Sequence, residues 1–167
     1  TEGLVGSEMC IRDRYYATKD NINMTRGEKI CAFIEHYCLI PEGAQVGQPI
    51  KLMKFQRKFI LDVFDNPCGT SRAYLSVARK NGKSALIAAI LLAHLVGPEA
   101  RQNSQIISGA RSRDQASLVF KLAEKMVRLS HELSKIVLIV QSQTMLVGLI
   151  CFVEFKAISA ESGTAHG

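Results

Sequence analysis

Apolar residues recur along this chain with two different spacings, and the spacing predicts where helices and strands lie. A capping box at residues 25–28, Thr-Arg-Gly-Glu, predicts the start of an amphipathic helix. Its apolar face comprises Ile30, Cys31, Ile34, Tyr37 and Cys38. We expect this helix to end at Pro41-Glu42-Gly43. A second amphipathic helix is expected over residues 54–64, ending at Asn66-Pro67.

The centre of the chain is a short apolar run, a polar turn and a long apolar segment. Residues 73–77, Ala-Tyr-Leu-Ser-Val, predict a buried strand, and residues 78–83 predict the turn. The helix that follows is expected from Ser84 to Val96 and is closed by Gly97-Pro98. Because it is apolar on all sides, we expect it to pack between a sheet and other elements.

The remaining chain alternates between the two spacings. A strand is expected at residues 105–108, and a second capping box at residues 112–115 predicts a long helix. Its inward face comprises Ala116, Val119, Phe120, Ala123, Met126 and Val127. Three strands are expected at 136–140, 145–149 and 151–158. This order predicts an α/β fold with a sheet that is at least partly parallel.

Composition narrows the functional classes only slightly. The 167 residues suit one domain with a core, and the net charge of +6 favours an acidic partner such as nucleic acid. Solvated Lys and Arg would explain the same charge. The five cysteines form no CxxC pair, so we interpret them as small buried hydrophobes in a reducing compartment. The longest apolar run, residues 85–96, is too short to cross a bilayer.

The tripeptide Gly82-Lys83-Ser84 is the strongest chemical signal. Between a predicted strand and a predicted helix, it has the context of a phosphate-binding loop. Gly82 lets the backbone approach a phosphate, Lys83 supplies a point charge, and the Ser84 hydroxyl can bind Mg²⁺. The alternative is a helix N-terminus that merely carries polar residues.

The loop departs from the common pattern because Val77 occupies the place of the first glycine, and Arg79 and Lys80 lie inside it. Residues 78–84, Ala-Arg-Lys-Asn-Gly-Lys-Ser, resemble the loop of the large terminase subunits of tailed phages, in particular the HK97-like group. Three further stretches are similar to that family: an adenine-recognition segment at 52–57, a strand-to-helix turn at 108–116, and the region before the Walker B strand at 155–167.

The resemblance implies a P-loop NTPase of the ASCE or RecA-like kind, with a mainly parallel sheet flanked by helices and a helical N-terminal lead-in. It implies ATP and Mg²⁺ as cofactors, Lys83 and Arg79 as catalytic residues, and Ser84 as the metal ligand. The implied nucleotide-binding residues are Gln56, Arg79, Lys80, Asn81, Gly82, Lys83 and Ser84. Two roles stay open: Gln56 alone could be a surface glutamine, and Arg79 could form a salt bridge instead of approaching the γ-phosphate.

The family also implies a function for the full-length protein: an ATPase that drives double-stranded DNA into a procapsid. Implied partners are the DNA, a portal protein and a small terminase subunit. The implied state is a ring oligomer docked on the procapsid in the host cytoplasm, without a membrane. The alternatives are another P-loop motor such as a helicase, or a non-catalytic nucleotide-binding or assembly module.

We expect three segments: a non-native or disordered leader at 1–14, a helical lead-in at 15–66, and a sheet core at 67–167. The Walker B aspartate and the catalytic glutamate are expected beyond Gly167, because after Ser84 the one aspartate is Asp114, in a helix cap. Asp62 follows three apolar residues but lies inside a predicted helix. We therefore expect this fragment alone to be inactive, and we expect no nuclease domain in it.

Overall fold

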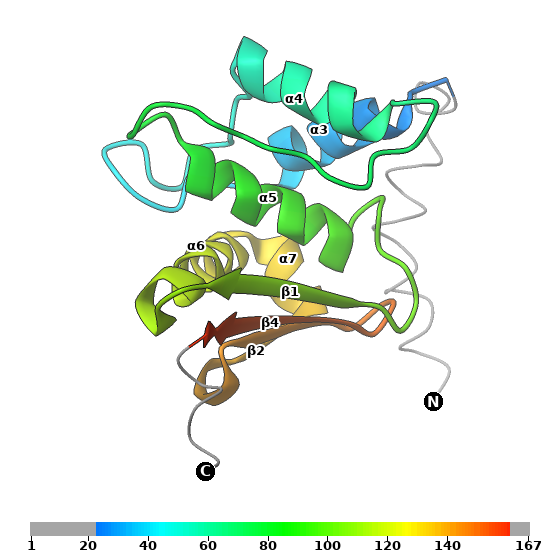
Figure 1. Cartoon of the computed structure of the whole chain (residues 1–167). Helices are drawn as coiled ribbons and strands as arrows, with labels where there is room; N and C mark the ends of the chain where they lie inside the picture. The colour runs from blue at the N-terminus through cyan, green and yellow to red at the C-terminus, as the bar shows by residue number, and fades with distance from the viewer. Residues whose placement is uncertain (1–22, 161–167) are drawn as a thin grey trace.

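The computed structural model describes residues 23–160, and its elements are stacked from a pair of helices down to a sheet (Figure 1). The helices are α3 (Arg26–Tyr37), α4 (Lys54–Phe64), α5 (Lys83–Leu95), α6 (Arg113–Leu129) and α7 (His131–Ile136). The strands are β1 (Gln105–Ala110), β2 (Val137–Val140), β3 (Met145–Gly148) and β4 (Val153–Ser159), with a 3₁₀ turn, η2 (Gln141–Gln143), between β2 and β3. The leader expected at residues 1–14 lies outside the described residues.

The first layer is formed by α3 and α4, which are joined at their ends by polar contacts. The predicted capping box of α3 is confirmed: the Thr25 hydroxyl accepts from the Glu28 amide, and the Glu28 carboxylate accepts from the Thr25 amide. Asp65, at the end of α4, accepts from the Gly27 amide and from the Thr25 hydroxyl, both at 2.7 Å. These bonds fix the start of one helix to the end of the other.

Helix α3 ends at Tyr37, earlier than the expected Pro41-Glu42-Gly43. The chain becomes extended at Cys38, and Leu39 forms an isolated bridge with Pro49. The Ile50 amide donates to the Cys38 carbonyl at 3.0 Å, which closes the loop at its base. This long-range pairing, rather than the proline, ends the helix.

Helix α5 lies in the middle of the stack, between α3 and α6 (Figure 1). Its buried residues surround most of the helix, which confirms the interpretation of its apolar sequence. Its C-terminal end touches the sheet at Gly148, where a Cβ atom would lie 2.3 Å from the Leu95 carbonyl oxygen. That position accepts only glycine, because a backbone atom occupies the space that a side chain would need.

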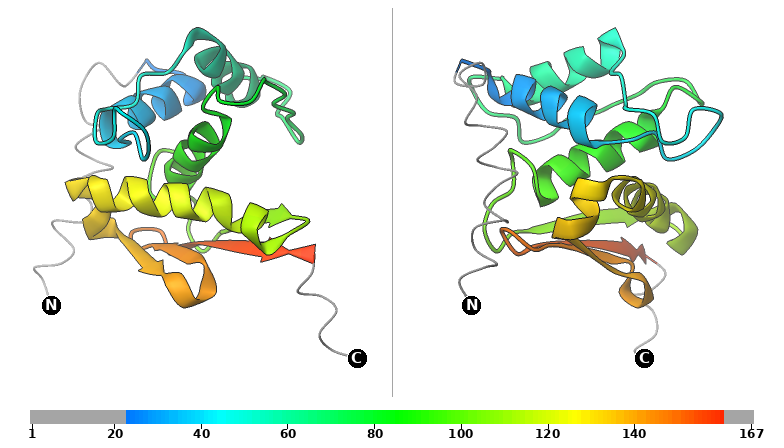
Figure 2. Two further views of the ribbon diagram at one scale, coloured as in Figure 1. Left: turned by 90° about the vertical axis from the view of Figure 1, so that its left-hand side faces the viewer. Right: turned by 180° about the vertical axis from the view of Figure 1, so that it is seen from behind.

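The sheet has the strand order β1-β4-β3-β2. Strands β1 and β4 pair in parallel, whereas β4–β3 and β3–β2 are antiparallel. Within residues 23–160 the sheet is therefore mixed: the expectation of an at least partly parallel sheet is confirmed, and that of a mainly parallel sheet is wrong for these four strands. The physical reason is the length of the connections: turns of a few residues join β2 to β3 and β3 to β4, and a parallel pair needs a long crossover. The α-helices of the described region lie on one side of the sheet, so they do not flank it (Figure 2).

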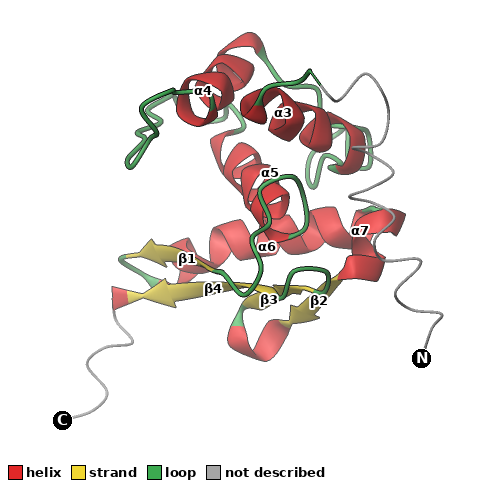
Figure 3. Ribbon diagram, turned by 90° about the vertical axis from the view of Figure 1, so that its right-hand side faces the viewer, coloured by secondary structure: helices red, strands yellow, loops and turns green. Residues whose placement is uncertain are grey.

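The expectation of a buried strand at residues 73–77 is wrong. The structure assigns this segment no regular secondary structure, and Tyr74 is 84% exposed. It runs between α4 and α5, with α5 and α6 separating it from the sheet (Figures 1 and 3). A strand exists only where a neighbouring strand accepts its backbone hydrogen bonds, and within residues 23–160 none lies beside it. Leu75 still packs against the core.

Three of the cysteines behave as predicted, since Cys31, Cys38 and Cys151 are buried free thiols. Cys68 is exposed, and Cys10 lies outside the described residues. Burial raises the pKa of the Cys31 thiol to about 11 and that of the Cys38 thiol to about 12. Within residues 23–160, no helix is long and apolar enough to cross a membrane.

Candidate functional site

The loop before α5 combines two left-handed residues with an uncapped helix start. Gly82 is the N-cap of α5 with φ of 68°, and no side chain caps the helix there. Lys80 has φ of 67°, in a region that favours glycine. The first-turn amides of Lys83, Ser84 and Ala85 have no acceptor within the helix. The loop therefore presents free N–H groups, together with the positive end of a helix, to any anion placed there.

A cavity of about 460 Å³ lies against this loop. The loop residues that line it are Ala78, Arg79, Lys80, Gly82, Lys83 and Ser84. Arg79, Lys80 and Lys83 are exposed, and within residues 23–160 none of the three forms an ion pair with a carboxylate. Three unpaired cations around one cavity create a site of strongly positive potential.

A second, mainly apolar cavity of about 200 Å³ adjoins the first, and the two share Ile40, Pro41, Gly82 and Ala85. Gln56 lines this second cavity and is only 6% exposed. Its Oε1 accepts from the Met53 amide at 3.0 Å, so it caps the start of α4. Its Nε2 lies 3.4 Å from where a Cβ of Gly82 would be. The structure therefore brings Gln56 next to Gly82 in the loop before α5, although the two are 26 positions apart along the chain.

Asn81 is the one proposed nucleotide-binding residue that lines neither cavity. Its side-chain amide donates to the Ala78 carbonyl at 3.3 Å, which closes the turn of the loop. In this structure the Asn81 side chain stabilises the turn of the loop instead of lining a cavity.

Sequence reasoning missed the opposite wall of the site. Ile40 and Pro41 line both cavities, and Glu42 and Leu122 line the larger one. An ion pair between Glu42 and Lys125 attaches this part of the chain to α6. The local sequence around Pro41 indicated only a helix end, because the contact that makes it a wall joins residues 83 positions apart.

Asp62 and Asp114 lie in helices, as the sequence predicts. Asp62 lies in α4 and pairs with Lys58, and Asp114 lies in the first turn of α6. Within residues 23–160, no three His, Cys, Asp or Glu side chains gather where they could hold a metal ion. The described site thus offers cations, free amides, one hydroxyl and the ion-paired carboxylate of Glu42 beside an apolar chamber. This combination suits a nucleotide, with phosphates at the loop and a base beyond Gly82.

Comparison with known families agrees with this geometry. The family model described as "Terminase large subunit, ATPase domain" matches residues 54–150, which is more than half of the 167 residues. The chain belongs to this family.

Two particular relatives extend the match. The chain is 62% identical over 144 residues to the terminase large subunit of Enterobacteria phage HK97. It is also similar to the crystal structure of the HK97 bacteriophage large terminase, with a TM-score of 0.79 and 60% sequence identity. Each match covers 86% of this chain but only 29% of the relative, so the chain spans less than a third of the length of the proteins that it resembles.

Proposed function

We propose that this chain is the ATP-binding part of a viral DNA-packaging motor, folded as a P-loop NTPase of the ASCE kind. The observation that carries the proposal is the continuity of two cavities. One is lined by three unpaired cations and an uncapped helix start, the other is apolar and contains Gln56, and both are lined by Gly82. The family assignment favours this function over the helicase and the assembly module.

The phosphates bind at the loop. Lys83 places a charge on the β- and γ-phosphates, and Gly82 allows the backbone amides to approach them. Arg79 stabilises charge on the transferring phosphoryl group, a role supported by its position at the cavity and by its lack of an ion pair within the described residues.

Lys80 has a special place among these cations. A residue with a Cβ in the left-handed region costs about 1 kcal/mol relative to glycine. A strained conformation retained at a ligand cavity supports a functional role for the side chain. We assign Lys80 to the outer phosphates and Asn81 to the loop backbone that binds them.

The base occupies the apolar cavity beside Gln56. Because Oε1 is already used by the Met53 amide, the free hydrogen-bonding group is the Nε2 donor. A buried donor without an acceptor among residues 23–160 favours a ligand that accepts a hydrogen bond, and a ring nitrogen of adenine is such a group.

Ser84 fits a role as Mg²⁺ ligand, because it lines the phosphate cavity in the first turn of α5. Bound there with ATP, Mg²⁺ would neutralise charge on the phosphates. Among the described residues, Glu42 is the carboxylate that lines this cavity, and it is paired with Lys125, so we expect this chain to hydrolyse ATP negligibly. Steady-state turnover by the purified chain at a rate typical of an ATPase would contradict that expectation.

In the full-length protein we assign the energy of hydrolysis to movement of double-stranded DNA into a procapsid, in the host cytoplasm. A portal protein, a small terminase subunit and a ring of identical subunits complete this proposal. Its support is the family assignment, and this chain covers only 29% of each of the two relatives.

The test is binding of a fluorescent ATP analogue by Lys83→Ala. A charged hydrogen bond contributes about 1.5–3 kcal/mol, so affinity should fall at least about tenfold. Lys135→Ala, on the exposed side of α7, is the matched control and should bind like the unmodified chain. Equal affinity of both variants would refute the phosphate-loop assignment.

A further inference from the structure

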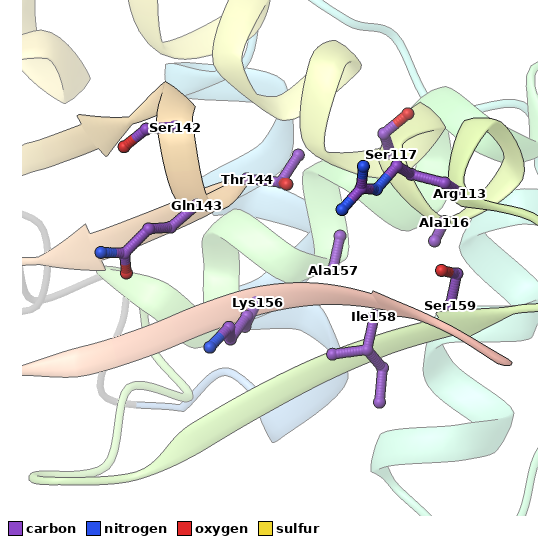
Figure 4. Close-up of a pocket in the computed structure, with 10 residues that line it drawn as sticks. All are labelled: Arg113, Ala116, Ser117, Ser142, Gln143, Thr144, Lys156, Ala157, Ile158 and Ser159. Carbon is purple, nitrogen blue, oxygen red and sulfur yellow. The ribbon is translucent and has the colours of Figure 1, made fainter. Parts of the chain in front are cut away.

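A third cavity, of about 370 Å³, lies where the start of α6 meets the sheet and shares no lining residue with the two nucleotide cavities. Figure 4 shows it between the start of α6, the η2 turn and the end of β4. The residues that matter here are Arg113, Ser117, Gln143, Thr144, Lys156 and Ser159. Nothing in the proposed nucleotide chemistry uses any of them.

Among the described residues 23–160, two cations and no carboxylate line this cavity. Arg113 comes from α6 and Lys156 from β4, and both are exposed. Across residues 23–160, neither forms an ion pair or a side-chain hydrogen bond with another residue. In contrast, Arg26, Arg57 and Lys125 each pair with a glutamate. The positive charge at the cavity is therefore available to a ligand.

Uncharged hydrogen-bonding groups complete the lining. In Figure 4 the Arg113 guanidinium extends toward Thr144 on the side of β4 that α6 covers, whereas the Lys156 side chain lies on the other side of β4. Amides and hydroxyls beside cations match a ligand that is rich in acceptor oxygens and negatively charged. The acceptor oxygens of a phosphodiester answer this description.

The lining also indicates which part of a nucleic acid fits. The cavity's lining residues in the described part of the chain include no aromatic ring, and the apolar ones are two alanines and Ile158. Single-stranded binding sites stack bases on aromatic rings, and a free nucleotide needs an apolar chamber for its base. Neither feature is present here, so the cavity suits the backbone of a duplex, whose bases remain stacked.

The binding would depend on side chains rather than on the start of α6. Ser112 caps this helix by accepting from the Gln115 amide, so one of the first-turn amides is already used. The Ser117 hydroxyl likewise donates to the Asp114 carbonyl. Arg113, on the α6 side of β4, and Lys156, on its other side, are the groups that would each contact a phosphate.

We propose that this cavity holds the phosphate backbone of duplex DNA through Arg113 and Lys156, at a site separate from the nucleotide. The inference rests on the proposed packaging function, because it assigns a place to the DNA that such a motor moves. Contacts to phosphate position a duplex without reading its sequence, which suits a protein that must move along any sequence.

The experiment measures binding of a fluorescent duplex of mixed sequence to the 167-residue chain across a salt titration. Each phosphate contact contributes about 0.9 to the slope of log K against log salt concentration. Arg113→Gln and Lys156→Gln should therefore each lower the slope by about 0.9. If the titration lines meet near 1 M salt, that corresponds to about eightfold weaker binding near 0.1 M.

Matched controls remove one charge elsewhere. Arg101→Gln changes an exposed cation before the opposite end of β1, and Lys135→Gln changes one on α7. Both should leave the slope near that of the unmodified chain. Arg113→Lys retains the charge and should restore most of the slope lost in Arg113→Gln, and thermal melting followed by circular dichroism identifies any variant that has not folded.

Slopes for the cavity variants equal to those of the controls would overturn the proposal. So would equal losses of slope with an acidic polypeptide in place of the duplex, since the site would then fit anionic protein. The same variants are titrated with the ATP analogue. Normal analogue binding without duplex binding by the unmodified chain refutes this inference and the DNA part of the function, whereas a Lys83→Ala variant that binds the analogue normally refutes the nucleotide site.

Discussion

Two strand-to-helix turns that look alike in the sequence differ in the structure. The first, residues 73–84, begins with a segment that pairs with no strand among residues 23–160; it contains two left-handed residues, and no side chain caps its helix. The second, residues 105–116, begins with strand β1, which pairs along its length with β4, and Ser112 caps its helix. In the second turn a side chain satisfies an amide of the helix, and in the first turn no side chain does.

The difference shows how a binding loop can be recognised from its own geometry. A helix start that is left without a cap, and a left-handed Lys80 where glycine would be relaxed, both lower stability. Features that cost stability at a cavity indicate that the loop is arranged for something other than folding. Four tests address this contrast, beginning with the largest expected effect.

Raising the pH tests how much the layer of α3 and α4, which packs against α5, contributes to the stability of the fold. Cys31 and Cys38 lie in and just after α3, which packs against α5. Their pKa values rise on folding from 9.0 to about 11 and about 12, so above pH 9 the unfolded chain loses these protons first. The free energy of unfolding should therefore fall by about 1.4 kcal/mol per pH unit for each thiol up to about pH 11. Urea unfolding at several pH values measures this.

Cys38→Ala should remove about half of this pH dependence, and Cys68→Ala, at an exposed position, should retain all of it. A pH dependence that both variants share would show that the buried thiols are not its cause.

Gly82→Ala tests the first turn directly. A Cβ at φ of 68° costs about 1 kcal/mol and would lie 3.4 Å from the Gln56 amide nitrogen. We expect at least about a tenfold loss of ATP-analogue affinity, or about 1.4 kcal/mol. Gly109→Ala, in the strand before the second turn, places its Cβ in open space and should leave the affinity unchanged. The contrast fails if both glycines tolerate alanine equally.

Ser112→Ala removes the cap of the second turn. Loss of an N-cap typically costs about 1 kcal/mol of stability, which urea unfolding would detect. Affinity for the nucleotide analogue should not change, because Ser112 lines neither nucleotide cavity. Weaker analogue binding by this variant would mean that the two turns are not independent.

Lys80→Gly should have the smallest effect on stability, and of opposite sign. Removal of the Cβ relieves the left-handed conformation and should stabilise the chain by up to about 1 kcal/mol. The same change should weaken binding of ATP analogues more than that of ADP analogues, because one cation near the outer phosphates is lost. An unchanged ratio of ATP-analogue to ADP-analogue affinity would refute the assignment of Lys80 to the outer phosphates.

Local patterns predicted most of the elements. The spacing of apolar residues located α3, α4, α5 and α6 and the four strands to within a few residues, and the Thr25 capping box was confirmed. These features depend on residues that are near one another in the chain, which is why a sequence contains them.

The errors have a common physical origin in partners distant along the chain. Residues 73–77 carry a strand pattern, but a strand also needs neighbours, and apolar spacing does not specify them. The wall formed by Ile40 and Pro41 likewise depends on contacts with elements that follow it in the sequence. The antiparallel pairing of the last three strands was within reach, because the short turns between them allow no crossover.

Helix α5 begins at the loop that lines the larger nucleotide cavity and ends in contact with the sheet at Gly148. Its 13 residues span about 20 Å, from Lys83 at the phosphate loop to Leu95, whose carbonyl oxygen faces Gly148 without room for a methyl group. Gly148 ends β3, and the strand begins just after the η2 turn, which lines the third cavity. Because the Leu95 and Gly148 backbones are in close contact, we expect a displacement of α5 along its axis to displace the β2–β3 hairpin as well.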